Sequence, residues 1–269
     1  MTQLTGKVAL ITGAGRGQGR AHAVTLAQAG ADIAALDICR NLPYPRYDLA
    51  SEADLDETVR QVEAEGRTAL KLIADVRNLN EIEEATQQAF DTFDHIDILI
   101  CNAGVCDMAN TWDITEAWWD IMVDINLKGC WTAIKCIVPR MIAQNKGGRI
   151  ILTSSVAGLK GMAGLAHYSA AKWGVVGLAK TLALEVAQYG ITVNTLHPTN
   201  VDTPLISGMA QAADIPLADF KAAIGQNNLL PVPLVEAQDL ANAALWLASD
   251  AARYVTGQEL KVDAGLMLK

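Results

Sequence analysis

Three side chains in the middle of the chain could move a proton together. Tyr168 and Lys172 stand four positions apart in the segment HYSAAK, so a helix there would place both on one face. A phenol titrates near ~10, but an adjacent ammonium favours the phenolate and lowers its pKa. Ser155 ends the run ILTSS, 13 residues before Tyr168. This set predicts that Tyr168 is a usable proton acceptor.

A glycine-rich turn near the start of the chain has the composition of a phosphate-binding loop. The segment TGAGRGQG follows the apolar run KVALI directly. In a parallel sheet, the first strand-to-helix turn presents free helix N–H groups and the positive end of the helix dipole to a pyrophosphate. Gly13 permits the tight turn, and Gly17 and Gly19 let the backbone and the helix approach closely. The turn therefore predicts a bound dinucleotide.

An acidic residue selects the type of dinucleotide. Asp37 lies in the second apolar run, DIAALDI, 18 residues after Gly19. A carboxylate there can accept both hydroxyls of an adenosine ribose and would repel a 2′-phosphate. Arg16 and Arg40 could attract such a phosphate, but a mobile surface arginine contributes less than a like-charge contact costs. We therefore predict NAD rather than NADP.

Short apolar runs alternate with segments of helical period along the whole chain. Runs that are apolar on both faces and joined by helices belong in a parallel sheet that is covered on both sides. Strands are predicted in residues 7–12, 32–38, 68–76, 96–104, 148–155, 191–198 and 258–265, and helices in 19–30, 51–65, 80–93, 115–144, 166–189 and 235–249. This order predicts a single α/β domain over residues 1–269, a doubly wound Rossmann fold with seven parallel strands and helices on both faces.

The composition excludes several classes of protein. Of 269 residues, 51% are hydrophobic and 19% charged, which predicts a chain that folds throughout. The net charge of −9 argues against nucleic acid or an anionic membrane as a partner. Five cysteines without a CxxC pair, a start without a signal-peptide pattern and only short apolar stretches predict a soluble, cytoplasmic protein. His22, His95 and His197 lack the spacing of metal ligands, so no metal is predicted.

Taken together, the motifs resemble the short-chain dehydrogenase/reductase superfamily. The likeness includes TGAGRGQG, NAG, YSAAK and HPTNVDT and covers nearly the whole chain. It implies a catalytic tetrad of Asn126, Ser155, Tyr168 and Lys172. Tyr168 would exchange the hydroxyl proton, and Ser155 would hydrogen-bond the substrate oxygen. Lys172 would lower the Tyr168 pKa and bind the nicotinamide ribose, and Asn126 would hold a water molecule of the proton relay. Hydride would pass directly between the substrate carbon and the nicotinamide.

The same resemblance implies the cofactor contacts. Asp75 and Val76 would frame the adenine, and Val201 and Thr203 would frame the carboxamide. The full set of implied cofactor-binding residues is Gly13, Arg16, Gly17, Gln18, Gly19, Asp37, Ile38, Asp75, Val76, Asn102, Ala103, Gly104, Tyr168, Lys172, Pro198, Val201 and Thr203.

Two positions differ from the family pattern. Cys101 stands where a second Asn usually precedes NAG, and Thr199 follows Pro198 where a Gly is usual. We expect Cys101 to serve packing, whereas Thr199 lies at the nicotinamide end of the site.

Further motifs resemble one branch of the superfamily, the carveol dehydrogenase-like, mycofactocin-associated members. These motifs are GQGR, LDIC followed by PYP, HPTNVDTP, LPVP and ARYVTGQELKVDAG. Such members carry a longer segment after the second strand and hold NAD without ready exchange, with the peptide-derived redox carrier mycofactocin as electron acceptor. Residues 39–50 match that insertion. A proline-stiffened flap there would cover the adenosine half of NAD and slow its release.

Residues 199–233 are predicted to form the substrate lid. The segment is long for a connection in a compact α/β domain, and it has no basic cluster for a carboxylate or phosphate. We therefore expect a neutral, apolar secondary alcohol or its ketone as substrate, such as the cyclic terpenoid alcohol carveol. The predicted interior residues of the lid are Leu205, Ile206, Met209, Ile215, Leu217, Phe220, Leu229 and Leu230.

Two other functions fit the motifs. One is an NAD(P)-dependent reductase of ketones, hydroxysteroids or 3-oxoacyl thioesters that exchanges its cofactor freely. The other is a regulator that binds NAD without catalysis, against which the complete set of Ser155, Tyr168 and Lys172 argues.

Tryptophans on the two longest predicted helices bear on the assembly. They are Trp118, Trp119, Trp131 and Trp173. Large aromatic side chains are common at interfaces, and the resemblance implies that these two helices pair between subunits. We therefore expect a homotetramer.

Overall fold

A parallel sheet forms the centre of the molecule, as the sequence predicts. The computed structural model describes residues 3–269, and within that range the main sheet has seven strands. The strands are β1 (Val8–Thr12), β2 (Asp32–Asp37), β3 (Ala69–Ile73), β4 (Ile98–Cys101), β5 (Gly148–Thr153), β6 (Ile191–Pro198) and β9 (Glu259–Val262). They lie in the order β3-β2-β1-β4-β5-β6-β9, and every neighbouring pair is parallel. The order reverses between β1 and β4, which is where an open α/β sheet binds its ligand.

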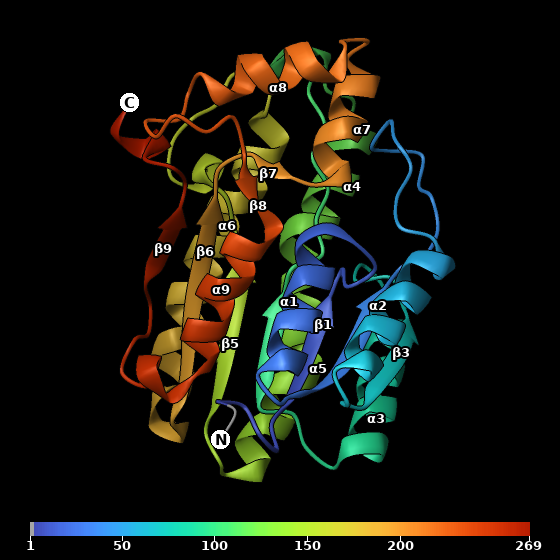
Figure 1. The fold of residues 1–269 in the computed structure, drawn as a ribbon, viewed down its shortest axis with the longest axis vertical. Helices are drawn as coiled ribbons and strands as arrows, with labels where there is room; N and C mark the ends of the chain where they lie inside the picture. The colour runs from blue at the N-terminus through green and yellow to red at the C-terminus, as the bar shows by residue number, and fades with distance from the viewer. Residues whose placement is uncertain (1–2) are drawn as a thin grey trace.

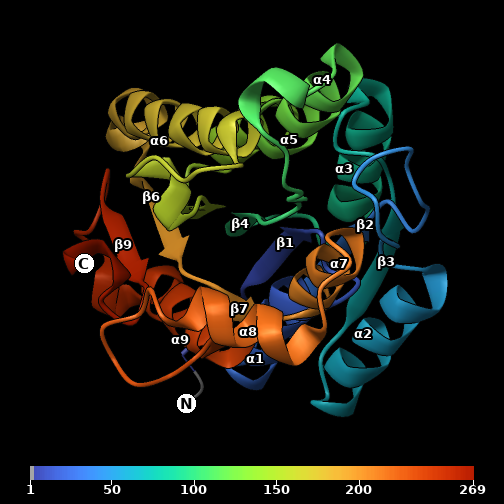
Figure 2. The same cartoon turned by 90° about the horizontal axis from the view of Figure 1, so that it is seen from above.

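Helices cover both faces of the sheet (Figures 1 and 2). The helices on one face are α1 (Gly17–Gln28), α2 (Glu52–Ala64) and α9 (Ala237–Ala248), and those on the other are α3 (Leu79–Phe93), α5 (Gly129–Gln144) and α6 (Ala166–Val186). Side chains alternate along each strand, so the two faces have separate cores. In β1, Val8 and Leu10 join the core beneath α3, α5 and α6, whereas Ala9 and Ile11 join the core beneath α1, α2 and α9. The predicted doubly wound Rossmann architecture is confirmed.

The helix predicted over residues 115–144 is interrupted. It consists of α4 (Glu116–Val123), a π-helical turn (Asp124–Lys128) and α5. The turn contains Asn126, which is buried and donates hydrogen bonds to the carbonyl oxygens of Val105 (2.9 Å) and Met122 (3.0 Å). Such π turns occur frequently at functional sites. Helical periodicity in the sequence does not reveal the extra residue in this turn.

Residues 199–233 contain regular elements that the sequence analysis did not predict. They include β7 (Val201–Asp202), α7 (Pro204–Ala212) and α8 (Leu217–Gly225), and β7 pairs with β8 (Val235–Glu236). α7 and α8 extend across the carboxyl ends of the main strands (Figure 1). Of the predicted interior residues, Ile206, Met209 and Phe220 are buried and Leu205 is half-buried, but Ile215, Leu217, Leu229 and Leu230 are exposed. The prediction was wrong for these four: Ile215 lies between the two short helices, Leu217 begins α8, and Leu229 and Leu230 follow it, and all four side chains face away from the core.

Each helix in residues 3–269 is too short or too polar to span a membrane.

A buried histidine makes the fold sensitive to acid. His22 lies on α1 with no exposed surface, and within the described residues neither of its ring nitrogens has a hydrogen-bond partner. Burial lowers the pKa of His22 to about 4 from its ordinary 6.5. Because the unfolded chain takes up this proton first, stability falls as pH drops through the window between these two values.

We expect this group alone to cost about 3 kcal/mol of the free energy of unfolding between pH 6.5 and pH 4. Denaturant melts of the wild type and of His22→Leu across that range measure the difference, because the leucine variant lacks the proton uptake. Parallel pH profiles for the two proteins would contradict the assignment.

Candidate active site

A crevice runs along the carboxyl ends of the central strands and has two halves. The dinucleotide half is lined by the glycine turn after β1, the end of β2 and the loops after β3 and β4. The reaction half is lined by the end of β5, the start of α6 and the turn after β6. Each predicted catalytic or cofactor residue lines one of these halves, apart from Gly19, which lies behind the glycine turn. The fold therefore brings together residues that are up to 190 positions apart, from Gly13 to Thr203.

The glycine turn packs too closely for side chains. Gly13 and Gly17 have φ angles of +68° and +56°, in the left-handed region that favours glycine. A Cβ atom on Gly19 would lie 1.9 Å from the carbonyl oxygen of Gly13. A Cβ atom on Gly13 would lie 2.7 Å from the Cα of Ala103, in the loop after β4. Glycine at these positions therefore lets the turn pack against its own backbone and against the loop after β4.

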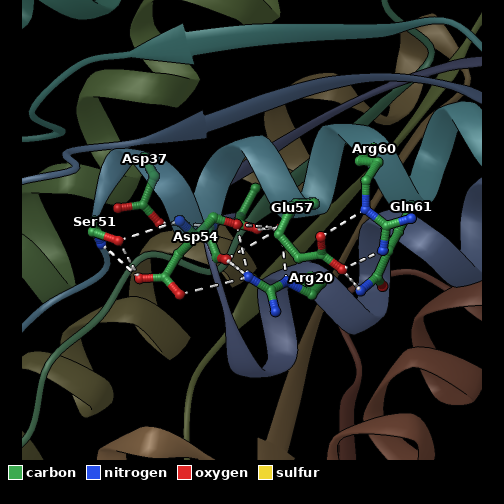
Figure 3. A network of polar contacts seen from close by, with 10 residues as sticks. Arg20, Asp37, Ser51, Asp54, Glu57, Arg60 and Gln61 are labelled. Atoms are coloured by element: carbon green, nitrogen blue, oxygen red, sulfur yellow. Dashed lines mark hydrogen bonds and ion pairs between the residues drawn. The ribbon is translucent and has the colours of Figure 1, made fainter.

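A polar network holds the outer side of this turn (Figure 3). Arg20 on α1 donates to the carbonyl oxygen of Gly15 at 2.6 Å and to the hydroxyl of Thr58 on α2 at 2.9 Å. Thr58 in turn donates to the carbonyl oxygen of Ala14 at 2.9 Å. The N–H of Gly15 donates to Asp37 Oδ2 at 2.8 Å. The carbonyl groups of Ala14 and Gly15 and the N–H group of Gly15 thus all have hydrogen-bond partners. These bonds stabilise the backbone of the turn.

Asp37 lies at the end of β2 with its carboxylate at the wall of the dinucleotide half. Burial raises its pKa, and hydrogen bonds from neighbouring N–H groups and the charge of Arg16 oppose that rise. The two arginines that could attract a 2′-phosphate both have partners. Arg40 pairs with Asp75 at 3.3 Å, and Arg16 donates to the carbonyl oxygen of Asp48. The site thus presents an acceptor to a ribose, in line with the predicted preference for NAD.

The predicted catalytic residues meet in the reaction half. Tyr168 and Lys172 share one face of α6, and the Lys172 ammonium lies 5.5 Å from the centre of the Tyr168 ring. Lys172 is buried and its Nζ donates to the carbonyl oxygen of Thr153 at 2.9 Å. Ser155 follows β5, and its side chain acts to lower the pKa of Tyr168. His197 Nδ1 lies 2.8 Å from the carbonyl oxygen of Ser155 and fixes the backbone there.

The protonation of Tyr168 differs from the sequence prediction. Burial raises its pKa above the ordinary value, Cys106 adds to the rise, and only the hydrogen bond with Ser155 lowers it. Burial also lowers the pKa of Lys172, so the ammonium that was expected to favour the phenolate is itself costly to keep charged. The sequence shows the charge of Lys172 beside Tyr168 but not that the fold buries both groups. Within the protein alone, both pKa shifts therefore favour the neutral forms of Tyr168 and Lys172.

Several buried polar atoms of the reaction half fit a ligand. Within residues 3–269, Gln18 Oε1, Asn126 Oδ1 and Thr153 Oγ1 have no hydrogen-bond partner. A Cβ atom on Gly104 would lie 2.8 Å from Asn126 Oδ1 and 3.4 Å from Lys172 Nζ, so this glycine keeps the space between them open. Buried acceptors without partners are costly in a protein interior. A dinucleotide with its bound water would supply donors to these atoms, and the glycine cradle has room for its phosphates.

The segment over residues 39–50, which we call the flap, contributes residues that the sequence analysis did not single out. Tyr44 is fully buried, its hydroxyl lies 2.8 Å from His167 Nε2, and its ring stacks on Trp118 with centroids 4.9 Å apart. The hydroxyl of Tyr47 donates to the carbonyl oxygen of Cys106 and accepts from its N–H. Flap residues that line the dinucleotide half are Leu42, Tyr47, Leu49 and Ala50. The flap thus joins the dinucleotide half to the start of α6, where His167 precedes Tyr168. The aromatic residues of the segment PYPRY were the feature of the sequence that could have indicated these contacts.

The two departures from the family pattern have different surroundings. Cys101 is buried in the core beneath α3, α5 and α6, as expected for a packing residue. The hydroxyl of Thr199 donates to Asn228 Oδ1 at 3.1 Å, and Asn228 donates onward to the carbonyl oxygen of Val232. Thr199 therefore links the turn after β6 to the segment that follows α8.

Comparison with known proteins agrees with this geometry. A family model described as Enoyl-(Acyl carrier protein) reductase matches residues 13–267. The chain belongs to the short-chain dehydrogenase/reductase family. The predicted family, and with it the enzyme class of oxidoreductases, is thereby confirmed.

Similar members of the short-chain dehydrogenase/reductase family include carveol dehydrogenases. The chain is 45% identical to the (-)-trans-carveol dehydrogenase of Rhodococcus erythropolis, over the whole of both chains. The structure of a carveol dehydrogenase from Mycobacterium avium in complex with NAD matches it with a TM-score of 0.95 and 42% identity, also over the whole of both chains. A short-chain dehydrogenase from Mycobacterium paratuberculosis bound to NAD matches 99% of the chain and all of its own, with a TM-score of 0.93 and 40% identity.

The close contact between Gly19 and the carbonyl group of Gly13 can be tested by substitution. Gly19→Ala would force its methyl group against the Gly13 carbonyl oxygen, so the turn must shift. We expect the Kd for NAD, measured by calorimetry on cofactor-stripped protein, to rise at least about tenfold, which corresponds to ~1.4 kcal/mol. Gly161→Ala is the matched control, because a Cβ atom there meets no described atom within 4 Å. Equal affinities in the two variants would show that the turn tolerates the methyl group.

Proposed function

We propose that this protein is an NAD-dependent dehydrogenase that interconverts an apolar secondary alcohol, such as the cyclic terpenoid alcohol carveol, and its ketone. The observation that carries the proposal is the meeting of Ser155, Tyr168 and Lys172 in one half of a crevice whose other half holds the glycine turn and Asp37. The Rhodococcus relative is named a carveol dehydrogenase, and the two mycobacterial relatives were solved with NAD. These names support both the substrate class and the cofactor.

Different residues of the crevice would bind the cofactor and transfer the proton. Asp37 would accept the adenosine ribose hydroxyls, the first turn of α1 would bind the pyrophosphate, and Lys172 would reach the second ribose. When bound, NAD supplies the carbon that accepts or returns the hydride. Tyr168 donates its proton to the oxygen of a ketone in reduction and takes up the hydroxyl proton of an alcohol in oxidation. Ser155 hydrogen-bonds that oxygen, and Asn126 Oδ1 can hold a water molecule beside Lys172.

Removing the phenolic hydroxyl tests the proposed function. Tyr168→Phe lacks the group that carries the proton, so turnover of carveol should fall at least about 100-fold. The NAD content of the protein should stay nearly unchanged, because the ring still fills its place. Tyr254→Phe is the matched control, since Tyr254 is 88% exposed. Oxidation of carveol with a dye as final electron acceptor measures the rates. A Tyr168→Phe enzyme with near-normal turnover would exclude Tyr168 as the acid and base.

The flap supports a second part of the proposal, slow release of NAD. Its residues line the dinucleotide half, and its attachment to α6 by Tyr44 and His167 opposes opening. Protein purified without added cofactor should therefore carry NAD, identified by mass and absorbance after denaturation.

In Tyr44→Phe, His167 loses its partner in a buried place, and we expect NAD to dissociate about tenfold faster. Stopped-flow displacement by excess NADH measures the rate, with Tyr254→Phe again as control. Wild-type protein that exchanges NAD within seconds would rule out the proposed role of the flap.

Three finer predictions go with this function. Mycofactocin as the electron acceptor rests on the branch resemblance alone. The homotetramer has support from Trp119, Trp131 and Trp173, which are 41–51% exposed, whereas Trp118 packs on Tyr44 instead. The cytoplasmic location rests on the cysteine pattern. All three stay predictions.

A further inference from the structure

A second cavity adjoins the reaction half, and residues of the lid form part of its wall. The two cavities share part of their walls, namely Met162, Leu165, Asn200, Ile206 and Met209. Beyond this shared wall the second cavity, which we call the outer chamber, is lined by Met108, Lys160, Gly161, Ala163, Phe220, Ile224, Gln226, Asn227, Leu266 and Lys269. α8 extends across the carboxyl ends of the strands (Figure 1), and its residues Phe220 and Ile224 line this cavity. The outer chamber therefore adjoins the space beside Tyr168, where Leu165 and the α7 residues Ile206 and Met209 line both cavities.

The volumes of the two cavities indicate where the larger part of a substrate could lie. The reaction half has a cavity volume of about 120 Å³ and must hold the nicotinamide as well as the reacting carbon. The outer chamber has about 530 Å³. Pockets for whole small-molecule ligands usually measure about 300–1,000 Å³. The outer chamber thus offers a substrate body several times the free space that the reaction half does.

The wall of the outer chamber is chemically graded. Phe220 is buried, and it joins Ile206 and Met209 in one apolar cluster with Leu165. Methionine side chains adapt to irregular apolar shapes. The exposed lining residues form the rim, in which the polar Gln226, Asn227 and Lys269 stand beside Met108, Gly161 and Ala163.

A hydrogen-bond chain keeps this rim in place. Lys269 Nζ donates to the carbonyl oxygens of Gln226 (2.7 Å) and Asn228 (3.0 Å). Asn228 is buried and accepts from Thr199 in the turn beside the reaction half. The outer chamber is therefore held at a fixed position relative to the reacting groups.

We infer that the substrate is an elongated apolar alcohol or ketone, whose carbinol carbon lies at Ser155 and Tyr168 and whose hydrocarbon body extends past Met162 and Met209 into the outer chamber. The inference rests on the proposed function and goes beyond it, because a single terpenoid ring would leave most of the outer chamber to water. A hydrocarbon tail that displaces this water gains affinity in proportion to its buried area.

A series of 4-alkylcyclohexanols with alkyl tails of increasing length tests the inference, with the protein as purified and a dye as final electron acceptor. We expect kcat/KM to rise about tenfold for each two methylenes that enter the outer chamber. Ile224→Trp fills part of that chamber, and there the ratio of kcat/KM for long and short alcohols should fall at least tenfold. Taking the ratio within each variant cancels differences in folding and cofactor content. Leu266→Trp provides a second obstruction.

Ile215→Trp is the matched control, because Ile215 is exposed and lines neither cavity, and its ratio should equal that of the wild type. A ratio independent of tail length in the wild type, or unchanged in both obstructed variants, would overturn the inference. If no alcohol is turned over at all, the proposed function fails instead. Calorimetric Kd values for the same series then decide the inference, with the same dependence on tail length expected.

Discussion

The reversal of strand order between β1 and β4 is the constraint on which the site depends. The chain leaves these neighbouring strands in opposite directions, so a crevice opens between the loops that follow them. Thr12 bridges it, because its hydroxyl accepts from the N–H groups of both Asn102 and Ala103 at 3.1 Å. Asn102 donates back to the carbonyl oxygens of Thr12 and Gly13 at 3.2 Å. These bonds fix the width of the crevice beside the glycine turn.

Burial and charge compete at the reacting groups. Lys172 and Tyr168 stand in a part of the crevice where the protein withdraws them from water, and both pKa shifts favour the neutral forms. The shift in the pKa of Tyr168 favours the phenol, which is the form that can donate a proton. Under the proposed function, oxidation of an alcohol requires the opposite state of Tyr168, and the positive charge of bound NAD+ would favour it. Binding of the oxidised cofactor would then promote the deprotonation of Tyr168.

The flap and the lid meet around the same groups. Tyr47 and Leu49 of the flap pack in one apolar cluster with Ile206 and Met209 of the lid, and Tyr168 contacts that cluster. The ring of Tyr47 lies against Gly208 on α7, where a Cβ atom would come within 2.5 Å of it. The cover of the dinucleotide half and the wall of the substrate cavity are thus one packed unit. A change in the packing of the flap should therefore alter the packing of the lid.

The sequence by itself determined the order of strands and helices, the glycine turn, Asp37 and the pairing of Tyr168 with Lys172. These features depend on local periodicity, on backbone freedom and on spacing along one helix, all of which short segments carry. The sequence could not supply the π turn at Asn126, the attachment of Tyr44 to His167, the direction of the Tyr168 pKa shift or the outer chamber. Each of these arises where segments distant in the chain pack together, and only the tertiary structure decides which side chains lose water and which cavities remain.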